Sequence, residues 1–463
     1  MIYLNTILDQ IISYKKSWIS DQKTRFPTHT LITHIQTSKR NFYNTLFHNK
    51  NKTTFILEYK CASPSTGIIC DNPNPITIAQ IYKKYASVIS IVTDEKYFHG
   101  NFNILPQISS IVTQPILCKD FFISKWQIYF ARLHKADAIL LMLSILNDET
   151  YRQFSYIAHS LNMGILTEVT NKNELKRAIL LNAKVIGINN RNLHDLSVDL
   201  NRTIKLSQNI PDSIIKISES GITHYHHIKK LKSYVNGFLI GTALMSQNQM
   251  NIAINKLILG ENKICGLTRT EDAYMSYNAG SIYGGLIFVE HSSRYIDIIT
   301  AKRIVFTPEQ HLKYIGVFCN AKINYIDYLV RTLNLYAVQL HGLENQNYIN
   351  KLRKQLPSDC QIWKAINMQK PSSSQPTYNL NLSYVNLYLL DNGGGSGKSF
   401  NWSYLSNMKL NKIILAGGLT IENCAKASQT GCLGLDFNSG VEDQPGIKNH
   451  QKIIKIFQIL RDY

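Results

Sequence analysis

The feature that most constrains this chain is a rhythm of short apolar runs separated by longer segments of helical pattern. From about residue 54 the runs are rich in β-branched residues, which is typical of strands that alternate with helices. The first half contains eight runs: FILEYK, VISIVTD, PILCKDF, DAILLML, GILTEV, KVIGINN, IIKISES and GFLIGTA. Eight parallel strands, each followed by a helix, close a (β/α)8 barrel.

The rhythm restarts after Asn262 and again runs to eight strands. The second set is KICGLT, GGLIFV, YIGVF, YAVQLH, IWKAI, LYLLD, KIILAG and CLGLDFNS. Two doubly wound open sheets are the alternative, but they would rarely repeat the same count of eight. We therefore predict an α/β protein of two consecutive (β/α)8 TIM barrels, formed by residues 1–258 and 259–463.

Ahead of the first run, the sequence predicts a helical N-terminal extension of the first barrel. Its apolar residues recur at helical spacing: Leu4, Ile7, Leu8, Ile11 and Ile12. Asp9 follows them closely and no basic n-region precedes them, which argues against a signal peptide. Apolar runs such as AILLML are too short to span a bilayer, so we expect no membrane partner.

Cysteine usage and charge indicate a cytoplasmic protein without a metal site or a nucleic-acid partner. The eight cysteines include no Cys-x-x-Cys pair and no metal-ligand spacing, as in reduced cytosolic proteins. The formal net charge is +19, yet the Lys residues are scattered and form no sustained basic run with aromatics. This surplus would suit anionic small substrates through electrostatic steering. The rival hypothesis, a nucleic-acid-binding protein, predicts binding that weakens steeply with salt.

The residues that end the runs of the first half are mostly charged. Active sites of such barrels lie at these C-terminal strand ends. The candidates are Glu58, Lys60, Lys119, Glu168, Asn189, Arg191 and Glu219. A lone buried charge is strongly disfavoured, whereas opposite charges that converge on one mouth can pair and can shift one another's pKa values. We predict proton-transfer groups here, and a ring of structural salt bridges is the alternative.

Small residues after the seventh and eighth runs predict anion binding in both halves. They are Ser220 and Gly221, Gly241 and Thr242, Gly417 and Gly418, and Asn438 and Ser439. Glycine frees backbone N–H groups at these positions, and a helix N-terminus can hold a phosphate on them. A tight turn explains any single glycine equally well, but four in register favour two sites for phosphorylated small molecules.

The second half has fewer polar strand ends. Cys265 is predicted inside its first strand, Arg294 in the loop after the second, and Asp391 at the end of the sixth. A buried cysteine is most often a small hydrophobe. Because a free thiol titrates near 8.5, nearby positive charge from Arg269 or Arg294 would have to lower its pKa by about 1.5 units. Asp391 is then the natural acid opposite the thiol.

The stretch LYLLDNGGGSGKSFNW resembles a nucleotide phosphate loop without matching one. Such a loop has a glycine five residues before the Gly of Gly-Lys-Ser, and Asn392 stands there. Asp391 would also put a carboxylate beside the phosphates. We therefore expect the loop to fold over a substrate of the second barrel, with Lys398 as a solvated charge.

Taken in order, these segments resemble the bifunctional family that joins indole-3-glycerol-phosphate synthase to phosphoribosylanthranilate isomerase in tryptophan biosynthesis. The resemblance runs nearly end to end. Its most specific stretches are FILEYKCASPS, PILCKDF, LLMLSIL, LTEV, VIGINNRNL, ISESGI and FLIGTALM, then KICGLTR, YGGLIF, AVQLHG, LLDNGGGSGKSFNW, LAGGLT and GLDFNSGVE.

The resemblance implies that the C-terminal half isomerises N-(5-phosphoribosyl)anthranilate to 1-(2-carboxyphenylamino)-1-deoxyribulose 5-phosphate, an Amadori rearrangement. Cys265 would be the base at C2, and Asp391 the acid at the ring oxygen. The substrate contacts would be Arg294 at the anthranilate, Gly418 and Ser439 at the phosphate, and Asn438.

The N-terminal half would close the indole ring of that product, with loss of carbon dioxide and water. Lys119 would be the general acid on the ketose carbonyl, Glu168 would take or return a proton later, and Lys60 would neutralise a substrate anion. The orienting groups would be Glu58, Asn189 and Glu219, and the phosphate and carboxylate contacts Arg191, Ser220, Gly221, Gly241 and Thr242. No metal or organic cofactor is implied.

A few positions depart from the family pattern. Cys61 and Thr66 stand where basic residues are common, Thr242 replaces a frequent Ser, and Asn401 replaces an Asp after a glycine loop one residue short. These changes predict weaker loop closure and remove no proton-transfer group. The alternative function is one retained activity with the other barrel structural. We expect a monomer, because the fused barrel covers surface that a lone barrel would bury by dimerising.

Overall fold

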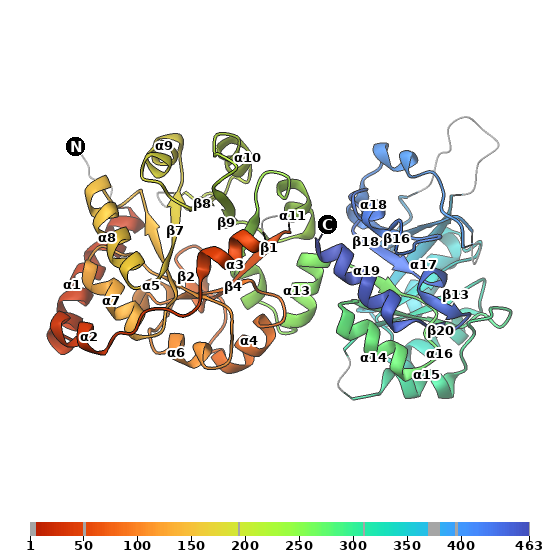
Figure 1. The fold of residues 1–463 in the computed structure, drawn as a ribbon. Coiled ribbons are helices and arrows are strands. Elements are labelled where there is room, and N and C mark those ends of the chain that lie inside the picture. Colours follow the sequence, from red (N-terminus) through yellow and green to blue (C-terminus); the bar gives the residue numbers. More distant parts are fainter. Residues whose placement is uncertain are drawn as a thin grey trace. The chain divides into compact units, whose positions relative to one another are not determined.

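The computed structural model describes residues 6–49, 52–192, 195–308, 311–368, 380–393 and 397–462. The chain separates into two compact units, Met1–Ile254 and Asn255–Tyr463, just ahead of the predicted division after residue 258. Each unit contains one closed sheet surrounded by helices (Figure 1). Leu4 of the predicted opening helix and residues 394–396 of the glycine loop lie outside the described residues.

All eight predicted runs of the first half form parallel strands of one closed barrel. Its hydrogen-bonded order is β1-β10-β9-β8-β7-β6-β5-β4, and β1 pairs with both β10 and β4 to close the ring. The strands are β1 (Thr54–Tyr59), β4 (Val88–Val92), β5 (Ile116–Lys119), β6 (Ala138–Met142), β7 (Gly164–Val169), β8 (Val185–Asn189), β9 (Ile215–Glu219) and β10 (Gly237–Ile240).

Helices follow the strands of the first barrel, and a short hairpin of β2 (Ala62–Ser63) and β3 (Gly67–Ile68) follows β1. The helices are α4 (Pro75–Tyr82), α5 (Glu95–Phe98), α6 (Ile104–Ser109), α7 (Lys125–Leu133), α8 (Asp148–Ser160), α9 (Lys172–Leu180), α10 (Asn201–Ser207), α11 (Tyr225–Leu231), α12 (Thr242–Met245) and α13 (Met250–Leu259).

The predicted N-terminal extension is three helices: α1 (Ile7–Arg25), α2 (Thr28–His34) and α3 (Phe42–His48). A capping box between Thr6 and Asp9 starts α1, which satisfies N–H groups that the first turn leaves unpaired. The apolar face of α1 joins the barrel core at Leu8 and Ile11. At the other end, Phe42 of α3 occupies the space beside Gly164, the first residue of β7, where any Cβ would clash at 2.3 Å.

The second set of eight runs forms a second closed barrel, with its strands hydrogen-bonded in sequence order from β11 to β18. The strands are β11 (Lys263–Ile264), β12 (Tyr283–Ile287), β13 (Lys313–Phe318), β14 (Ala337–Leu340), β15 (Gln361–Asn367), β16 (Leu387–Asp391), β17 (Ile413–Leu415) and β18 (Gly434–Phe437). The prediction that Cys265 lies inside the first strand is wrong. β11 ends at Ile264, and the Cys265 N–H donates to Phe437 O just beyond the strand.

Helical segments cover the second barrel, and a hairpin of β19 (Glu442–Gln444) and β20 (Ile447–Lys448) precedes the last helix. They are α14 (Thr270–Ala279), α15 (Ile298–Val305), α16 (Ile323–Leu333), α17 (Gln346–Gln355), the 3-10 turns η1 (Trp402–Asn407) and η2 (Leu410–Lys412), α18 (Cys424–Ser428), η3 (Ser439–Val441) and α19 (His450–Asp462). Among the described residues, none of the helices has both the length and the apolarity that crossing a membrane requires.

Candidate active sites

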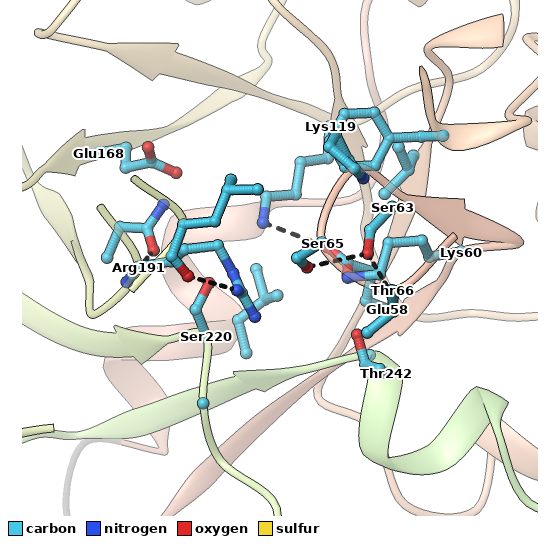
Figure 2. A pocket seen from close by; sticks show the side chains of 18 of the residues that line it. Glu58, Lys60, Ser63, Ser65, Thr66, Lys119, Glu168, Arg191, Ser220 and Thr242 are labelled. Carbon is cyan, nitrogen blue, oxygen red and sulfur yellow. Dashed lines mark hydrogen bonds and ion pairs between the residues drawn. The ribbon is translucent and has the colours of Figure 1, made fainter. Parts of the chain in front are cut away.

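A cavity of about 300 Å³ opens at the C-terminal ends of the strands in the first barrel. Figure 2 shows its polar side chains, with Lys119 and Glu168 reaching toward the same space from β5 and β7. The predicted residues that line it are Glu58, Lys60, Lys119, Glu168, Asn189, Arg191, Ser220, Gly221, Gly241 and Thr242. Glu219 does not line the cavity, but it is fully buried and contacts Lys119.

Lys119 is held as a charged ammonium between two carboxylates. Its Nζ lies 3.2 Å from Glu58 Oε2 and 3.2 Å from Glu219 Oε2. Burial opposes the charge of Lys119, but Glu58, Glu219 and Glu168 outweigh it and raise its pKa. Lys60 lies 2.7 Å from the other oxygen of Glu58. Burial likewise opposes the charge of Glu58, and the two lysines overcome it and lower its pKa to about 2.

Glu168 is the carboxyl group that this network leaves without an ammonium partner. Three carboxyl groups share two lysines, and both lysines contact Glu58 or Glu219. Burial and the Glu219 carboxylate raise the pKa of Glu168, with Lys119 opposing the shift. Within the described part of the chain, Glu168 Oε1 is buried without a hydrogen-bond partner. The cavity therefore holds a charged acid, Lys119, and a carboxyl group that can carry a proton near neutral pH.

Two glycines make room for this network. A Cβ on Gly187 of β8 would lie 1.8 Å from Glu219 Oε1, and one on Gly241 would lie 2.4 Å from Glu58 Oε1. Atoms cannot approach so closely, so any side chain at either position would push a carboxylate away from Lys119. Gly241 was predicted only as a phosphate contact, and Gly187 was not predicted at all.

The loop after β9 forms the polar wall expected to hold an anion. Ser220 and Gly221 both take left-handed backbone conformations, with φ of 65° and 79°. For Ser220 this conformation is strained, as is common where function dictates the backbone. The Asn190 amide donates to the carbonyls of Glu219 and Ser220, at 3.0 and 3.1 Å, and thereby holds the turn. Thr242 begins α12 on the other side of the same cavity.

The N-terminal extension supplies an apolar wall that the sequence did not place in the site. Ile7, Leu8 and Ile11 of α1 line the cavity. The buried ammonium of Lys15 lies 2.7 Å from Asp94 and 2.7 Å from Asp120, which follow β4 and β5. These ion pairs fix α1 over the mouth of the barrel. Further apolar side chains of the wall are Phe98, Phe121, Leu140 and Met142, and Thr66 lines the cavity beside Ser63 and Ser65.

A second cavity, of about 600 Å³, lies at the same end of the second barrel. The predicted residues that line it are Cys265, Arg294, Asp391, Gly418, Asn438 and Ser439. Lys263 is buried behind the thiol, where it contacts Cys265 and lies 2.7 Å from Asp436 Oδ2. Burial and the Asp436 carboxylate raise the pKa of Cys265, although Lys263 lowers it in part.

The expectation that a nearby arginine brings the pKa of Cys265 below its usual value is wrong, because burial outweighs the positive charges around the thiol. Arg294 donates to Glu442 from Nε and Nη2, at 2.9 and 2.7 Å. Arg269 pairs with Asp272 at 2.7 Å. The cationic neighbours that lower the pKa of the thiol are Lys263 and, to a smaller extent, Lys448, and neither was predicted from the sequence.

Asp391 faces the same cavity as Cys265, and its pKa is raised above the usual value. Burial raises the pKa of Asp391, and the N–H of Asn392, which donates to Asp391 Oδ1 at 2.7 Å, opposes the shift only in part. His341 Nε2 lies 3.7 Å from the other oxygen. Asp391 can therefore donate a proton into the cavity.

The described parts of the glycine loop run close to the predicted phosphate contacts. A Cβ on Gly418 would lie 2.7 Å from the backbone of Lys398 and Ser399, and one on Gly397 would lie 3.6 Å from Ser439 Oγ. Gly397 also lines the cavity. The segment that follows Asp391 thus returns over the end of β17, as a cover for a bound substrate would.

Comparisons with known proteins match both halves of the chain. Residues 8–257 match the family described as indole-3-glycerol phosphate synthase, and residues 262–459 match N-(5'phosphoribosyl)anthranilate (PRA) isomerase. The tryptophan biosynthesis protein TrpCF of Yersinia pestis is 53% identical over 459 residues, which cover 99% of this chain and 95% of that protein. TrpCF of Buchnera aphidicola subsp. Diuraphis noxia is 54% identical, covering 99% of each chain. TrpCF of Salmonella typhi is 50% identical, covering 99% of this chain and 100% of that one.

The chain belongs to the bifunctional synthase–isomerase family. It is an enzyme of tryptophan biosynthesis with a synthase barrel, the first, and an isomerase barrel, the second. Because both family matches are present, the alternative of a single retained activity does not hold. Its substrates are phosphorylated small molecules.

Three features of the two sites were not predicted from the sequence. In the synthase barrel these are Gly187 and the wall of α1, and in the isomerase barrel the pair of Lys263 and Asp436. The pair carried a usable signal, because a Lys at the start of one predicted strand and an Asp inside another are costly unless they meet. Of the departures from the family pattern, Cys61 is buried, and Asn401 caps η1 by accepting the Ser403 N–H.

Proposed function

We propose that Lys119 and Glu168 carry the proton transfers of the synthase barrel, and that Cys265 and Asp391 carry those of the isomerase barrel. The observation that carries this proposal is that each pair converges on one cavity at the mouth of its own barrel. The pKa directions support it as well, since Lys119 stays charged while Glu168 and Asp391 shift toward their protonated forms.

In the synthase barrel, Lys119 donates a proton to the ketose carbonyl oxygen as the aromatic carbon attacks the carbonyl carbon. Glu58 and Glu219 hold the ammonium in position for this step. Carbon dioxide then leaves the ring carbon, and Glu168 takes or returns the proton as water departs. The buried position of Glu168 supports this role, because its raised pKa lets it act in both directions near neutral pH.

The ends of the synthase substrate fit opposite walls of the cavity. The phosphate binds the backbone of Ser220 and Gly221 with Gly241 and the Thr242 hydroxyl, and Asn189 orients the loop by accepting the Arg191 N–H at 2.9 Å. Lys60 and Arg191 offer positive charge to the carboxylate. The apolar wall of α1 packs against the aromatic ring, which water would otherwise surround.

In the isomerase barrel, Asp391 protonates the ring oxygen of N-(5-phosphoribosyl)anthranilate as the sugar opens to an imine. The thiolate of Cys265 then removes the proton from C2, and the resulting enol becomes the ketose of 1-(2-carboxyphenylamino)-1-deoxyribulose 5-phosphate. Lys263 stabilises the thiolate during this step, since its ammonium contacts the sulfur. Gly418, Asn438 and Ser439 hold the phosphate, and Arg294 contacts the anthranilate portion.

Crossed substitutions test these assignments. We expect Lys119→Ala to abolish ring closure of the supplied ketose phosphate and to leave isomerisation intact, and Cys265→Ala to do the reverse. Absorbance and product analysis of each purified variant, with each substrate given separately, measure both reactions. A circular-dichroism spectrum and a urea midpoint equal to those of the wild type show that the altered barrel is folded. A variant that retains the activity of its own barrel refutes the role of that residue.

We further propose that the enzyme acts as a cytoplasmic monomer without a nucleic-acid partner. All eight cysteines are free, which supports a reducing compartment. Light scattering coupled to size exclusion tests the monomer. A sedimentation titration with duplex DNA at two salt concentrations tests the absence of nucleic-acid binding, and salt-sensitive binding would refute it.

A further inference from the structure

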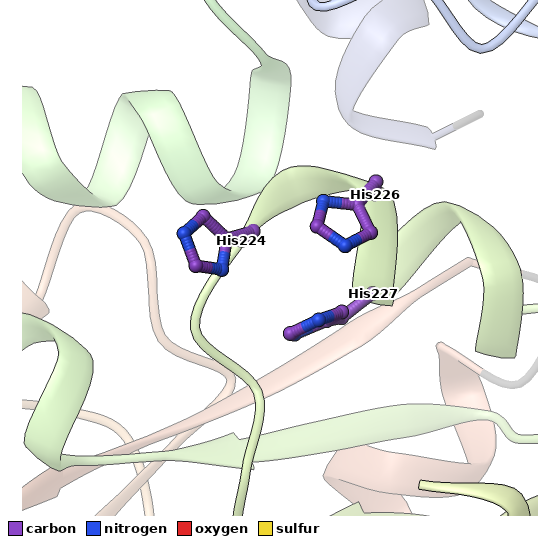
Figure 3. A group of neighbouring side chains, drawn as sticks. All are labelled: His224, His226 and His227. Atoms are coloured by element: carbon purple, nitrogen blue, oxygen red, sulfur yellow. The ribbon is translucent and has the colours of Figure 1, made fainter. Parts of the chain in front are cut away.

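Three histidines gather at the start of α11, where neither proposed mechanism uses them. The rings of His224, His226 and His227 lie next to one another, as Figure 3 shows. One ligand nitrogen from each lies within 4.8 Å of those of the other two. In the part of the chain that the structure describes, no other group of three or more His, Cys, Asp or Glu side chains comes as close to sharing an ion.

The local backbone explains why residues so near in sequence converge. His224 is the extended residue that caps α11, and His226 and His227 lie in the first helical turn. The rings of His226 and His227 are 4.2 Å apart between centroids, and His224 lies 5.4 and 5.3 Å from them. A tetrahedral ion with metal–nitrogen bonds of about 2.0–2.1 Å separates its ligand nitrogens by about 3.3 Å. Small ring rotations, which the exposed His224 and His226 can make, close this gap.

The local environment lowers the pKa of two of the three rings. Burial and the neighbouring histidines lower the pKa of His227 to about 4, with Lys230 adding to the shift. The pKa of His226 is lowered by the same kinds of neighbour. Both imidazoles are therefore neutral near pH 7 and keep a lone pair for a ligand bond.

We propose that His224, His226 and His227 form a binding site for a divalent transition ion of the nickel and zinc class. Neutral imidazole is the ligand that these ions share, and affinity for such nitrogen sites follows the order in which Ni²⁺ and Cu²⁺ bind most tightly. Three imidazoles leave one position of a tetrahedral ion for water or a small anion.

The site is coupled to the synthase cavity through Thr223. The Thr223 N–H donates to His227 Nδ1 at 3.3 Å, and the Thr223 hydroxyl lies 2.8 Å from His224 Nδ1. An ion on His227 Nδ1 takes the lone pair that accepts this N–H. An ion on Nε2 requires the proton to sit on Nδ1, which also ends the acceptor role. In either case the Thr223 N–H loses its acceptor.

Thr223 lines the synthase cavity together with Ser220 and Gly221. Metal binding therefore disturbs the loop that holds the substrate phosphate, a consequence that rests on the phosphate contacts proposed above. We expect a raised KM of the synthase reaction with a smaller change of kcat, and no effect on the isomerase reaction, because none of the three histidines lines the isomerase cavity.

Calorimetric titration with Ni²⁺ tests the site directly. Ni²⁺ is the probe because it prefers imidazole to thiolate, so exposed cysteines compete little. The titration uses the protein without a histidine tag. We expect one ion per chain, at least tenfold weaker binding in the His224→Ala/His226→Ala variant, which keeps the His227 acceptor of the Thr223 N–H, and unchanged binding in His29→Ala, which removes an exposed histidine elsewhere in the same unit. Equal affinity in the double variant and the wild type overturns the proposal.

The two activities then test the coupling. Both reactions are measured with and without saturating Ni²⁺, in the wild type and in His224→Ala/His226→Ala. We expect at least a threefold rise of the synthase KM in the wild type alone. Full activity of the double variant without metal shows that it is folded. Ni²⁺ binding at the histidines with an unchanged synthase KM overturns the coupling, and equal inhibition of both reactions does so too.

Discussion

In the synthase barrel the proposed general acid Lys119 is a charged ammonium between two carboxylates, whereas in the isomerase barrel Cys265 and Asp391 both shift toward neutral forms. The C-terminal strand ends of the two barrels thus have opposite electrostatic arrangements. The synthase mouth concentrates its ion pairs on the reacting groups. The isomerase mouth places them beside the reacting groups, as Lys263 with Asp436 and Arg294 with Glu442.

The difference shows that the fold supplies the location of a site and the pairing of charges supplies its chemistry. A charged acid is ready to protonate a carbonyl, so the synthase mouth is preset for its first step. A neutral thiol must first lose its proton, so the isomerase mouth depends on nearby ammonium groups, above all on Lys263. The covers differ too, with a helix, α1, over the synthase cavity and the glycine loop beside the isomerase cavity.

The largest expected effects come from Glu168 and Asp391, the carboxyl groups that line the two cavities and have a raised pKa. We expect Glu168→Gln to lower the synthase kcat about 10²–10⁴-fold, and Asp391→Asn to lower the isomerase kcat in the same range. Each amide keeps the shape of the carboxyl group but cannot act as a general acid or base. Steady-state rates with separate substrates measure both. If either variant stays within threefold of the wild type, that carboxyl group transfers no proton in the rate-limiting step.

A somewhat smaller effect is expected when α1, the helix over the synthase cavity, loses the ion pairs of Lys15 that hold it there. Lys15→Met leaves the buried Asp94 and Asp120 without their cation, which costs about 3–5 kcal/mol of unfolding free energy. The urea midpoint for loss of synthase activity should fall, while the midpoint for the isomerase should not. Lys16→Met, on the exposed face of the same helix, is the control. An unchanged synthase midpoint would mean that α1 is held by its apolar face alone.

Lys263→Met should sharpen the contrast by its effect on pH dependence. The productive form has a Cys265 thiolate and a protonated Asp391. Because the thiol titrates at higher pH than the carboxyl group, the fraction of enzyme in this form is constant between the two pKa values and falls above that of the thiol. The alkaline limb of the bell-shaped pH–rate profile therefore reports the pKa of the thiol. Lys263 lowers this pKa more than Asp436 raises it. Its loss therefore moves the alkaline limb to higher pH and lowers the plateau about tenfold for each unit. A profile that keeps its shape would show that Lys263 does not act through the thiol.

The smallest effect is expected at Lys398, which a nucleotide loop would require. We expect Lys398→Ala to change the isomerase kcat and KM by less than about threefold, since the side chain is exposed and it is the backbone of Lys398 that lies close to Gly418. Protease protection of the loop with and without ATP is the companion measurement. Protection by ATP that the substitution removes would favour a phosphate loop.

Most of the fold was predictable, because strand and helix periodicity is a local property. All sixteen predicted runs form barrel strands, and the helical extension begins where Thr6 and Asp9 can cap it. Charged residues at the predicted strand ends also indicated where the cavities lie. Such residues are tolerated only where they meet, and parallel strands bring their C-terminal ends together.

The sequence by itself determined two barrels, the ends at which their sites lie, and the residue types gathered there. Only the tertiary structure decided which charges pair. Lys119 pairs with Glu58 and Glu219. Glu442 neutralises Arg294, and Lys263 lies against Cys265. The reason is physical. Periodicity acts between neighbours along the chain, whereas a pKa depends on burial and on charges a few ångströms away, which come from strands far apart in sequence.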